Sequence, residues 1–253
     1  MLSFRNVSVR LDHKMILRDI SFDLRPNRLT ALLGRNGSGK STLLSCVNRQ
    51  VRYTGEIRYD EEDLAGIAPM ERAKRIAYLP QMLPAPRIPG EEMAAFGRNP
   101  YLDFTGRLTR DDREIVAQAL REANAETLAS RYVSTLSGGE RQRIALAMIL
   151  AQNTPVSLLD EPTAHMDQTH ETAFLRTLRK MKEEKNKTFL VALHDLNLAA
   201  EFADDVILLE GGKLVFAGTK EACLEQRILE KTLSLRRYTV EDSGRQKFFF
   251  SGA

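Results

Sequence analysis

Alternation of hydrophobic and polar residues opens the chain and predicts two β-strands, each with one solvated face. Apolar residues nearly alternate with polar ones over residues 2–11 and alternate strictly over residues 20–24. Strands that are apolar on one face only are typical of antiparallel sheets whose other face is in water. We therefore expect a small antiparallel sheet near the N-terminus.

Short, uninterrupted apolar runs further along the chain predict strands that are buried on both faces. These runs cover residues 30–33, 76–79, 156–159, 188–193 and 206–209. Helical patterns separate several of the runs, and strands that alternate with helices favour a parallel sheet. The predicted fold class is therefore α/β with a parallel central sheet.

The pattern of apolar and polar residues changes between residues 82 and 135. Pro and Gly are frequent up to Gly106, and a charged helical pattern covers residues 109–130. Thr109 can cap this helix, and Asp111 and Asp112 favour its positive N-terminal end. We interpret residues 82–135 as a mostly helical insertion in the core.

Length and composition limit the classes of protein to which the chain can belong. Its 253 residues are 43% hydrophobic, which suits one large domain or a domain with an inserted subdomain. The net charge is only +3 and the charges are interspersed, whereas nucleic-acid-binding proteins typically carry clustered basic residues. Aromatic residues make up 7% of the chain and Trp is absent, which disfavours a stacking surface for single strands. We therefore predict no nucleic-acid partner.

Neither a secretory signal nor a membrane-spanning segment is predicted. The N-terminal residues alternate and lack the apolar core of a signal peptide. The longest helical apolar stretch, residues 144–151, is far shorter than the ~20 residues that span a bilayer. Cys46 and Cys223 suggest neither a disulfide framework nor a zinc site. We expect a cytoplasmic protein that reaches a membrane only through a partner.

A glycine-rich motif, G-x-x-x-x-G-K-S, follows the predicted strand at residues 30–33. Its glycines let backbone N–H groups turn inward and cradle phosphate oxygens, beside the positive end of the next helix. Lys40 would reach the β- and γ-phosphates and the Ser41 hydroxyl would bind Mg²⁺. The alternative is an accidental glycine turn that opens a helix. The residues of the motif are Gly34, Arg35, Asn36, Gly37, Ser38, Gly39, Lys40, Ser41 and Thr42.

Two acidic residues end the apolar strand at residues 156–159. A carboxylate at the end of a buried strand is costly unless it serves a cation or a hydrogen bond. Asp160 suits the coordination of Mg²⁺, and Glu161 suits the polarisation of an attacking water. Alone, such acids often just terminate strands, but the phosphate motif strengthens the functional interpretation.

A second pair of glycines, Gly138 and Gly139, follows Ser137 at the start of an apolar helix that runs to about Gln152. Taken alone, Ser137 would be an ordinary helix cap. Next to the phosphate motif, the segment instead predicts a second phosphate-type site in the same chain.

Together these motifs resemble those of the ATP-binding-cassette (ABC) ATPases, over essentially the whole chain up to Thr219. GRNGSGKST resembles the Walker A loop, VSLLDE the Walker B strand, and LSGGERQR the signature motif. The resemblance implies catalytic roles for Glu161, for Gln81 in the Q-loop and for His194 as the switch histidine. It also implies that Gln81 contributes to the Mg²⁺ site and that Asp167 of the D-loop belongs to the nucleotide site.

The same resemblance implies one ABC ATPase domain over residues 1–253, with ATP and Mg²⁺ as cofactors. Its parts would be a nucleotide-binding core with an antiparallel β subdomain, a helical subdomain and a C-terminal tail, at approximately 1–81 with 136–219, 82–135 and 220–253. Two copies would meet head-to-tail as a homodimer, because the signature motif of one copy completes the nucleotide site of the other. The signature residues implied at that site are Ser137, Gly138, Gly139 and Glu140.

The chain departs from the family pattern in three places, the last of which involves two residues. Relatives usually stack an aromatic residue on adenine where this chain has Leu11, with His13 two residues further on. Glu140 stands where many relatives carry Gln. The D-loop, residues 164–167, contains His165 and Met166 in place of the more usual Ala and Leu. We interpret the histidines other than His194, which are His13, His165 and His170, as surface residues rather than metal ligands.

The cargo is suggested by two short segments, FGRNPY at 96–101 and LAQNTP at 150–155. They resemble the ATPase subunits of bacterial importers for ferric siderophores, ferric dicitrate, haem and cobalamin. The resemblance implies an iron chelate as the first choice of cargo, haem as the second and cobalamin as the third. The implied partners are a membrane permease and a periplasmic or lipoprotein substrate-binding protein, with the chain at the cytoplasmic face of a bacterial membrane. The alternatives are an exporter subunit and a soluble cassette protein that acts on DNA or ribosomes.

Overall fold

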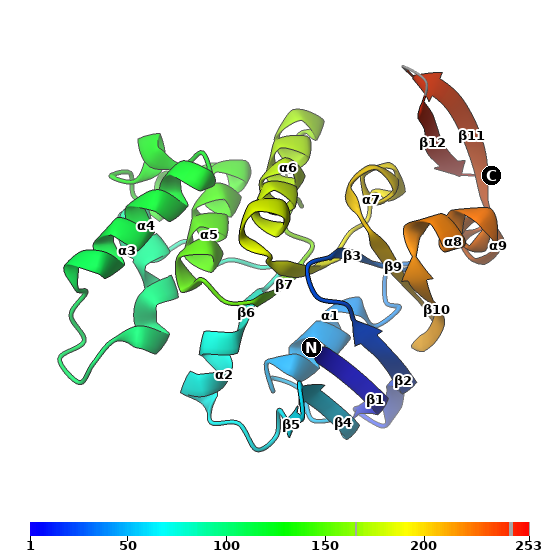
Figure 1. The fold of residues 1–253 in the computed structure, drawn as a ribbon, viewed down its shortest axis with the longest axis horizontal. Coiled ribbons are helices and arrows are strands. Elements are labelled where there is room, and N and C mark those ends of the chain that lie inside the picture. The colour runs from blue at the N-terminus through cyan, green and yellow to red at the C-terminus, as the bar shows by residue number, and fades with distance from the viewer. Residues whose placement is uncertain (165, 243–244, 253) are drawn as a thin grey trace. The chain divides into compact units, whose positions relative to one another are not determined.

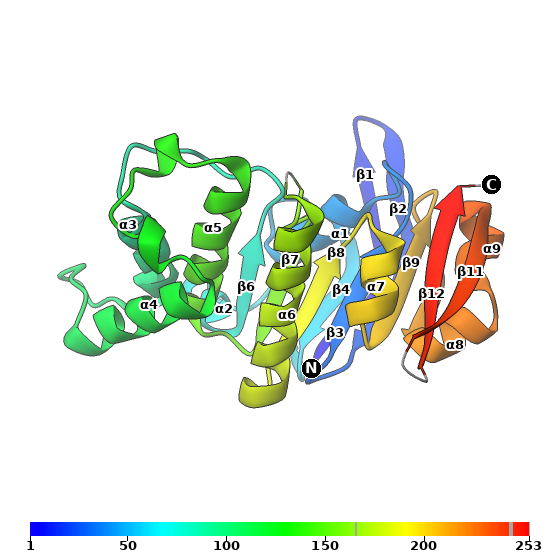
Figure 2. The same cartoon turned by 90° about the horizontal axis from the view of Figure 1, so that it is seen from above.

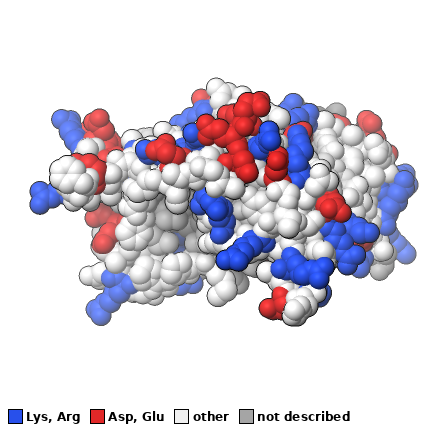
Figure 3. All heavy atoms as spheres, turned by 90° about the horizontal axis from the view of Figure 1, so that it is seen from below, with Lys and Arg blue, Asp and Glu red and all other residues white. Residues whose placement is uncertain are grey.

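The computed structural model describes residues 1–164, 166–242 and 245–252, which form two compact units. The first unit combines residues 1–66 with residues 188–253, and the second consists of residues 67–187. Within the described residues, no helix is both long enough and apolar enough to cross a membrane. Positive and negative side chains both occur across the face shown in Figure 3, in agreement with the interspersed charges of the sequence.

The first unit contains the antiparallel sheet that the alternating pattern predicts. Its strand order is β2-β1-β4-β5, and β1 pairs antiparallel with both β2 and β4. Phe4 and Phe22 are directly paired, and their buried rings stack with centroids 4.3 Å apart. The prediction of an antiparallel N-terminal sheet is therefore confirmed. The strands are β1 Leu2–Leu11, β2 Lys14–Leu24, β4 Thr54–Tyr59 and β5 Glu62–Asp63.

A second sheet in the first unit is built on strand β3. Strand β3 pairs in parallel with β8 and β9, and β10 continues the sheet antiparallel to β9. Every residue of β3 and β8 is buried, which explains why both are continuous apolar runs in the sequence. The elements are β3 Leu29–Leu33, α1 Lys40–Val47, β8 Thr188–Ala192, α7 Leu196–Phe202, β9 Asp205–Glu210 and β10 Lys213–Thr219.

The second unit consists of two parallel strands, β6 and β7, and a group of helices. Helices α3 and α4 and the 3₁₀ helix η1 pack around α5, as Figure 1 shows in green. These parallel pairings confirm the predicted α/β class. The strands are β6 Ile76–Leu79 and β7 Val156–Asp160. The helices are α2 Pro69–Arg75, α3 Gly90–Ala95, η1 Phe96–Tyr101, α4 Arg110–Glu122, η2 Glu126–Leu128, η3 Val133–Thr135, α5 Gly138–Gln152 and α6 Gln168–Lys185.

Helix α4 begins where the sequence predicts and ends earlier. The Thr109 hydroxyl accepts the Asp112 N–H, while the Asp112 carboxylate accepts the Thr109 N–H at 3.0 Å, which forms a capping box. The helical pattern predicted as far as residue 130 is wrong beyond Glu122. Asn124 adopts φ 51°, a left-handed conformation that Asn tolerates and that ends a helix.

A buried ion pair fixes the FGRNPY segment. Arg98 Nε donates to Asp112 Oδ1 at 2.8 Å and Arg98 NH1 donates to the Ala151 carbonyl at 2.9 Å, which ties η1 to α4 and α5. Burial raises the pKa of Asp112, but hydrogen bonds from Thr109 and Arg98 outweigh it, so that the pKa lies below its usual value. Part of this motif therefore serves the packing of the second unit.

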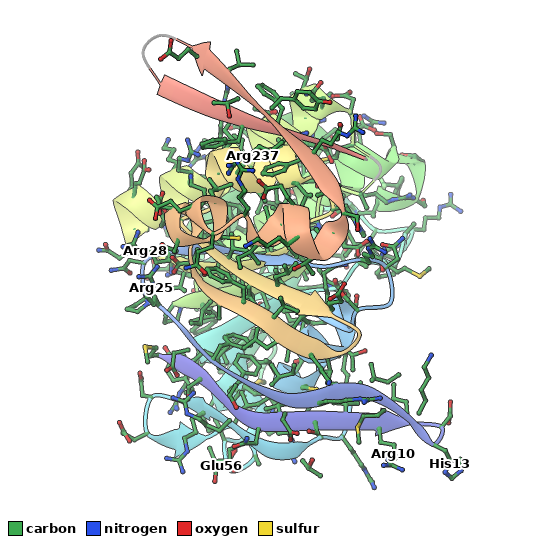
Figure 4. The ribbon with its side chains drawn as sticks, turned by 90° about the vertical axis from the view of Figure 1, so that its right-hand side faces the viewer. Arg10, His13, Arg25, Arg28, Glu56 and Arg237 are labelled. Atoms are coloured by element: carbon green, nitrogen blue, oxygen red, sulfur yellow. The ribbon has the colours of Figure 1, made fainter. Side chains whose placement is uncertain are left out.

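The C-terminal residues fold into two short helices and a β-hairpin, whereas the sequence pattern predicts only a helical portion and a polar stretch. Strands β11 and β12 pair antiparallel, and Figure 2 shows the hairpin beside α7, which β12 contacts. Arg237 lies between the hairpin and the helices (Figure 4), where its Nε pairs with Glu230 at 3.1 Å. The elements are α8 Lys220–Glu225, α9 Ile228–Leu233, β11 Leu235–Asp242 and β12 Arg245–Gly252.

Candidate functional site

The glycine-rich motif forms the turn between β3 and α1 in the first unit. Gly34, Gly37 and Gly39 have φ of 149°, 77° and 103°, a region that other residues rarely adopt. A Cβ atom on Gly34 would lie 2.3 Å from the Leu209 carbonyl oxygen, and one on Gly39 would lie 2.5 Å from Leu17 Cδ2. Close packing therefore requires glycine at Gly34, where the neighbour is backbone. At Gly39 the neighbour is the end of a flexible side chain and the positive φ favours glycine, whereas Gly37 has open space around it.

Two polar groups of this loop are buried. Lys40 is 4% exposed, and its Nζ donates to the Gly34 carbonyl at 2.9 Å. The buried Ser38 Oγ has no hydrogen-bond partner within the described residues. A buried ammonium and an unsatisfied hydroxyl both carry a desolvation cost that a bound phosphate would offset. The loop therefore fits a phosphate ligand.

The start of α1 is open to an anion. Gly39 is its N-cap, and among the described residues no side chain caps the helix; the first turn also lacks acidic residues. The N–H groups at a helix start carry a partial positive charge and attract anions. Ser41 and Thr42 lie in this first turn, as the motif predicts, and Arg35 and Asn36 are exposed on the loop.

The C-terminal tail contacts two predicted parts of the site, which the sequence did not suggest. Arg35 NH2 donates to the carbonyl of Leu233, the last residue of α9, at 3.0 Å. The Phe250 N–H of β12 donates to Asn197 Oδ1 in α7 at 2.8 Å. Helix α7 is capped by Asp195 and begins just after His194, which is exposed. The tail thus holds both the phosphate loop and the helix that follows the predicted switch histidine.

The predicted adenine contact lies at the end of β1. Leu11 is 42% exposed and pairs with Lys14 across the turn that Asp12 and His13 form. Figure 4 shows Arg10 and His13 projecting outward beside this turn. An exposed leucine is common on protein surfaces, so the role of Leu11 toward adenine stays a prediction.

In the second unit, the structure brings two predicted catalytic residues together. Gln81 Nε2 donates to Glu161 Oε2 at 2.6 Å, although the residues lie 80 positions apart. Glu161 directly follows β7 and has φ 49°, a left-handed conformation that is uncommon for Glu and is typical of functional sites. The neighbouring Asp160 is 2% exposed. The strained backbone and the amide of Gln81 together orient the Glu161 carboxylate.

The signature motif forms the start of α5. Ser137 is the N-cap, and its Oγ accepts the Glu140 N–H at 3.3 Å, while Glu140 Oε2 accepts the Ser137 N–H at 2.8 Å. A Cβ atom on Gly139 would meet nothing closer than Met166 Cγ at 3.7 Å, so packing does not require this glycine. Gly138 is the first residue of the helix. The capping box accounts for Ser137 and Glu140 structurally, but it does not account for Gly139.

Arg131 is a residue of this site that sequence reasoning missed. Its NH1 donates to Glu140 Oε1 at 2.5 Å. The pKa of the Glu140 carboxyl lies below its usual value, mainly because it accepts the Ser137 N–H; burial opposes this effect and Arg131 adds to it. Glu140 is therefore a charged carboxylate at neutral pH.

Asp167, which is predicted to belong to the nucleotide site, has a structural role in α6. It caps α6, where its Oδ1 accepts the His170 N–H at 2.9 Å and its Oδ2 lies 2.8 Å from His170 Nδ1. These bonds, the first above all, lower the pKa of Asp167. His170 is exposed, as predicted, and His165 lies outside the described residues.

The predicted Mg²⁺ ligands are Ser41, Gln81 and Asp160. Over residues 1–164, 166–242 and 245–252, no three His, Cys, Asp or Glu side chains cluster in a way that could hold a metal ion. Magnesium commonly takes only one or two protein ligands and completes its shell with water and phosphate oxygens. Ser41 lies in the first turn of α1 in the first unit, and the buried Asp160 is the last residue of β7 in the second unit. A hydroxyl and a carboxylate are both ligand types that Mg²⁺ accepts.

Comparison with known proteins identifies the family. The ABC transporter family matches residues 17–164. The petrobactin import ATP-binding protein YclP of Bacillus subtilis (strain 168) is 34% identical over 91% of this chain and 92% of its own length. The hemin import ATP-binding protein HmuV of Pseudomonas fluorescens (strain Pf0-1) is 41% identical over 93% of each chain.

Solved structures agree. A metal-chelate type ABC transporter in an inward-facing conformation matches with a TM-score of 0.85 and 25% identity, over 99% of this chain and 96% of its own. A bacterial ABC transporter cassette solved as a dimer matches with a TM-score of 0.76 and 26% identity, over 87% of this chain and 99% of its own. With the phosphate loop, the Gln81–Glu161 pair and the signature helix in place, these matches show that the chain belongs to the ABC transporter family, as an ATP-binding ATPase subunit.

Proposed function

We propose that this chain hydrolyses ATP to power the import of an iron chelate, such as a ferric siderophore, through a membrane permease. The observation that carries the proposal is a glycine loop with a buried lysine at the start of α1, together with a separate Ser-Gly-Gly helix start at α5, in a chain similar to a petrobactin import subunit. The permease would hold the chain at the cytoplasmic face of the membrane, and a substrate-binding protein would deliver the cargo from outside.

Binding and hydrolysis would use different residues. Lys40 and the N–H groups of its loop would hold the β- and γ-phosphates, and Ser41, Asp160 and Gln81 would hold Mg²⁺, which neutralises phosphate charge. Glu161 would accept a proton from the attacking water.

Two further side chains would orient these groups. The Gln81 amide, already bonded to the Glu161 carboxylate, would keep it turned to the water. His194, at the start of α7, would contact the region of the γ-phosphate.

We further propose that the active form is a head-to-tail homodimer. The chain has one phosphate loop and one signature motif, and a similar cassette has been solved as a dimer. Ser137 and the open backbone at Gly139 would contact the nucleotide bound by the other copy, with Asp167 nearby in the same site. ATP would hold the copies together, and its hydrolysis would release them.

Exposed apolar residues of the second unit support a permease contact. Phe104 and Met82 are almost fully exposed, and Phe96 and Tyr101 of η1 are partly exposed. Helix α2 packs against η1 and carries a further exposed residue, Met70. Contiguous apolar patches typically mark protein interfaces, and we propose that these residues form a patch that contacts the permease.

Haem is the second candidate cargo. It is kept as a candidate because the chain is more similar to the haem relative than to the petrobactin relative. The identities are 41% and 34%, over similar shares of the chain. The import subunit does not bind the cargo itself, so the permease decides between the two.

The test is reconstitution of the chain in liposomes with its permease. We expect ATP-dependent uptake of a ferric siderophore, and no uptake when Glu161→Gln replaces the unmodified chain. Uptake of haem but not of the siderophore would select the second candidate. ATP hydrolysis that no permease stimulates would contradict a role in transport.

A further inference from the structure

The start of α5 carries a negative charge where the proposed function needs an attraction for phosphate. Glu140 lies in the first turn of the helix and points back to the Ser137 N–H, one of the groups at the positive end. The carboxylate therefore already binds one of the N–H groups with which this helix start could attract an anion. Left uncompensated, it would also repel the triphosphate of a bound nucleotide.

Arg131 compensates this charge. Its guanidinium contacts Glu140 Oε1, while the other oxygen of the same carboxylate remains on Ser137. The Arg131 side chain is 45% exposed and that of Glu140 is 22% exposed. The pair thus lies at the surface, where a second molecule can approach it.

The Arg131 backbone is held independently of its side chain. Its N–H donates to the Leu128 carbonyl at 3.1 Å, and its carbonyl accepts the Gly90 N–H at 2.9 Å. A substitution of the Arg131 side chain can therefore remove the charge without removing these bonds. The side chain is available for a role other than folding.

We infer that Arg131 is a positioning residue of the signature motif: it neutralises Glu140 and holds it in the capping box, so that Ser137 and the Gly139 backbone can meet the partner copy's ATP. This inference rests on the proposed head-to-tail dimer. It assigns to Arg131 no contact with the nucleotide bound by its own copy.

The test is a double-mutant cycle between Arg131→Met and Glu140→Gln, with dimerisation measured by analytical ultracentrifugation at saturating ATP and Mg²⁺. All variants carry Glu161→Gln, which slows hydrolysis and preserves the ATP-bound state. We expect Arg131→Met to weaken ATP-driven dimerisation at least tenfold when Glu140 is present and less than twofold in the Glu140→Gln background. ATP affinity of the monomer should change less than twofold.

Two further variants separate charge from structure. Arg131→Lys keeps the positive charge and should restore at least half of the lost dimerisation free energy. Arg110→Met, the matched control, breaks the exposed ion pair of Arg110 with Glu114 on α4 and should leave dimerisation unchanged. Thermal unfolding of each variant shows whether a loss of dimer reflects a loss of fold.

The outcomes distinguish this inference from the proposed function. An unchanged dimer in Arg131→Met, or an equal loss whether Glu140 is kept or replaced by glutamine, would overturn the role of Arg131 and leave the proposed dimer intact. A parent chain that stays monomeric with ATP would overturn both. A loss that Arg131→Lys does not relieve and that follows the melting temperature would assign Arg131 a purely structural role.

Discussion

The helix starts of α1 and α5 both contain glycine, as the N-cap of α1 and in the first turn of α5, but their charged side chains differ. At α1 the glycine loop surrounds the buried ammonium of Lys40, and among the described residues no side chain caps the helix. At α5 the helix is closed by its own Ser137 and Glu140, and Arg131 balances the carboxylate. The first start combines a buried cation with uncapped N–H groups, whereas the second pairs its carboxylate with Arg131.

This difference would let the two proposed phosphate sites of one chain serve different purposes. A buried cation beside uncapped N–H groups can bind an anion on its own. A neutral, capped helix start gains little from an anion alone and needs a nucleotide that is already fixed elsewhere. We therefore expect the α1 start to set ATP affinity and the α5 start to set dimerisation.

The largest expected effect is that of Lys40→Ala on nucleotide binding. Removing a buried cation that faces the β- and γ-phosphates should cost about 4 kcal/mol, or roughly 1,000-fold in ATP affinity. Isothermal titration of ATP into the monomer measures it. Lys74→Ala, which removes an exposed lysine paired with Glu71, is the control and should bind normally. Unchanged affinity in Lys40→Ala would refute the assignment of the loop.

Ser137→Arg should abolish dimerisation but leave ATP binding by the monomer nearly unchanged. A bulky side chain at the start of α5 blocks the close approach of the other copy, so the ATP-driven dimer should be lost. Monomer affinity for ATP should stay within about twofold, because the α1 start is untouched. Ultracentrifugation with and without ATP measures dimerisation, and titration with ATP measures the affinity of the monomer. Full ATPase activity in this variant would show that hydrolysis does not need the dimer.

Alanine at Gly34 and at Gly139 compares the two glycine turns directly. Gly34→Ala forces a Cβ into the Leu209 carbonyl at a positive φ and should lower the free energy of unfolding by about 2 kcal/mol. The Cβ of Gly139→Ala would have only ordinary contacts, so this substitution should change the free energy of unfolding by less than about 0.5 kcal/mol. Denaturant unfolding of both variants gives the comparison. Equal destabilisation would mean that packing, not ligand approach, explains Gly139.

The smallest expected effect is the loss, at acidic pH, of the stability that the Glu140 cap contributes. Because the folded pKa of Glu140 is lowered, its cap stabilises the protein above the unfolded pKa of about 4.3 and is lost as pH falls below that value. The loss should be at most about 1 kcal/mol, since the side chain is partly exposed and screened. Comparing thermal unfolding of the unmodified chain and Glu140→Gln from pH 7 to pH 3.5 isolates it. A difference that grows toward low pH would contradict the assigned sign.

Local patterns were sufficient to predict much of this protein. Seven strands, β1–β3 and β6–β9, as well as the phosphate loop and the signature helix, depend on residues close together in sequence, through alternation, apolar runs and glycine spacing. Strands β4, β5 and β10 were not predicted. The cap at Thr109 was predictable for the same reason, since a cap acts within one helical turn.

The sequence by itself therefore determined the α/β class and the family, and it nominated the residues proposed to bind phosphate. The tertiary structure alone decided which residues and elements meet. These contacts join Gln81 with Glu161, Arg131 with Glu140, and the C-terminal hairpin with α7. The first and last of these contacts join distant segments, so no spacing or period in the sequence encodes them. Arg131 lies only nine residues from Glu140, but the turn between them, not a repeating pattern, sets the direction of its side chain.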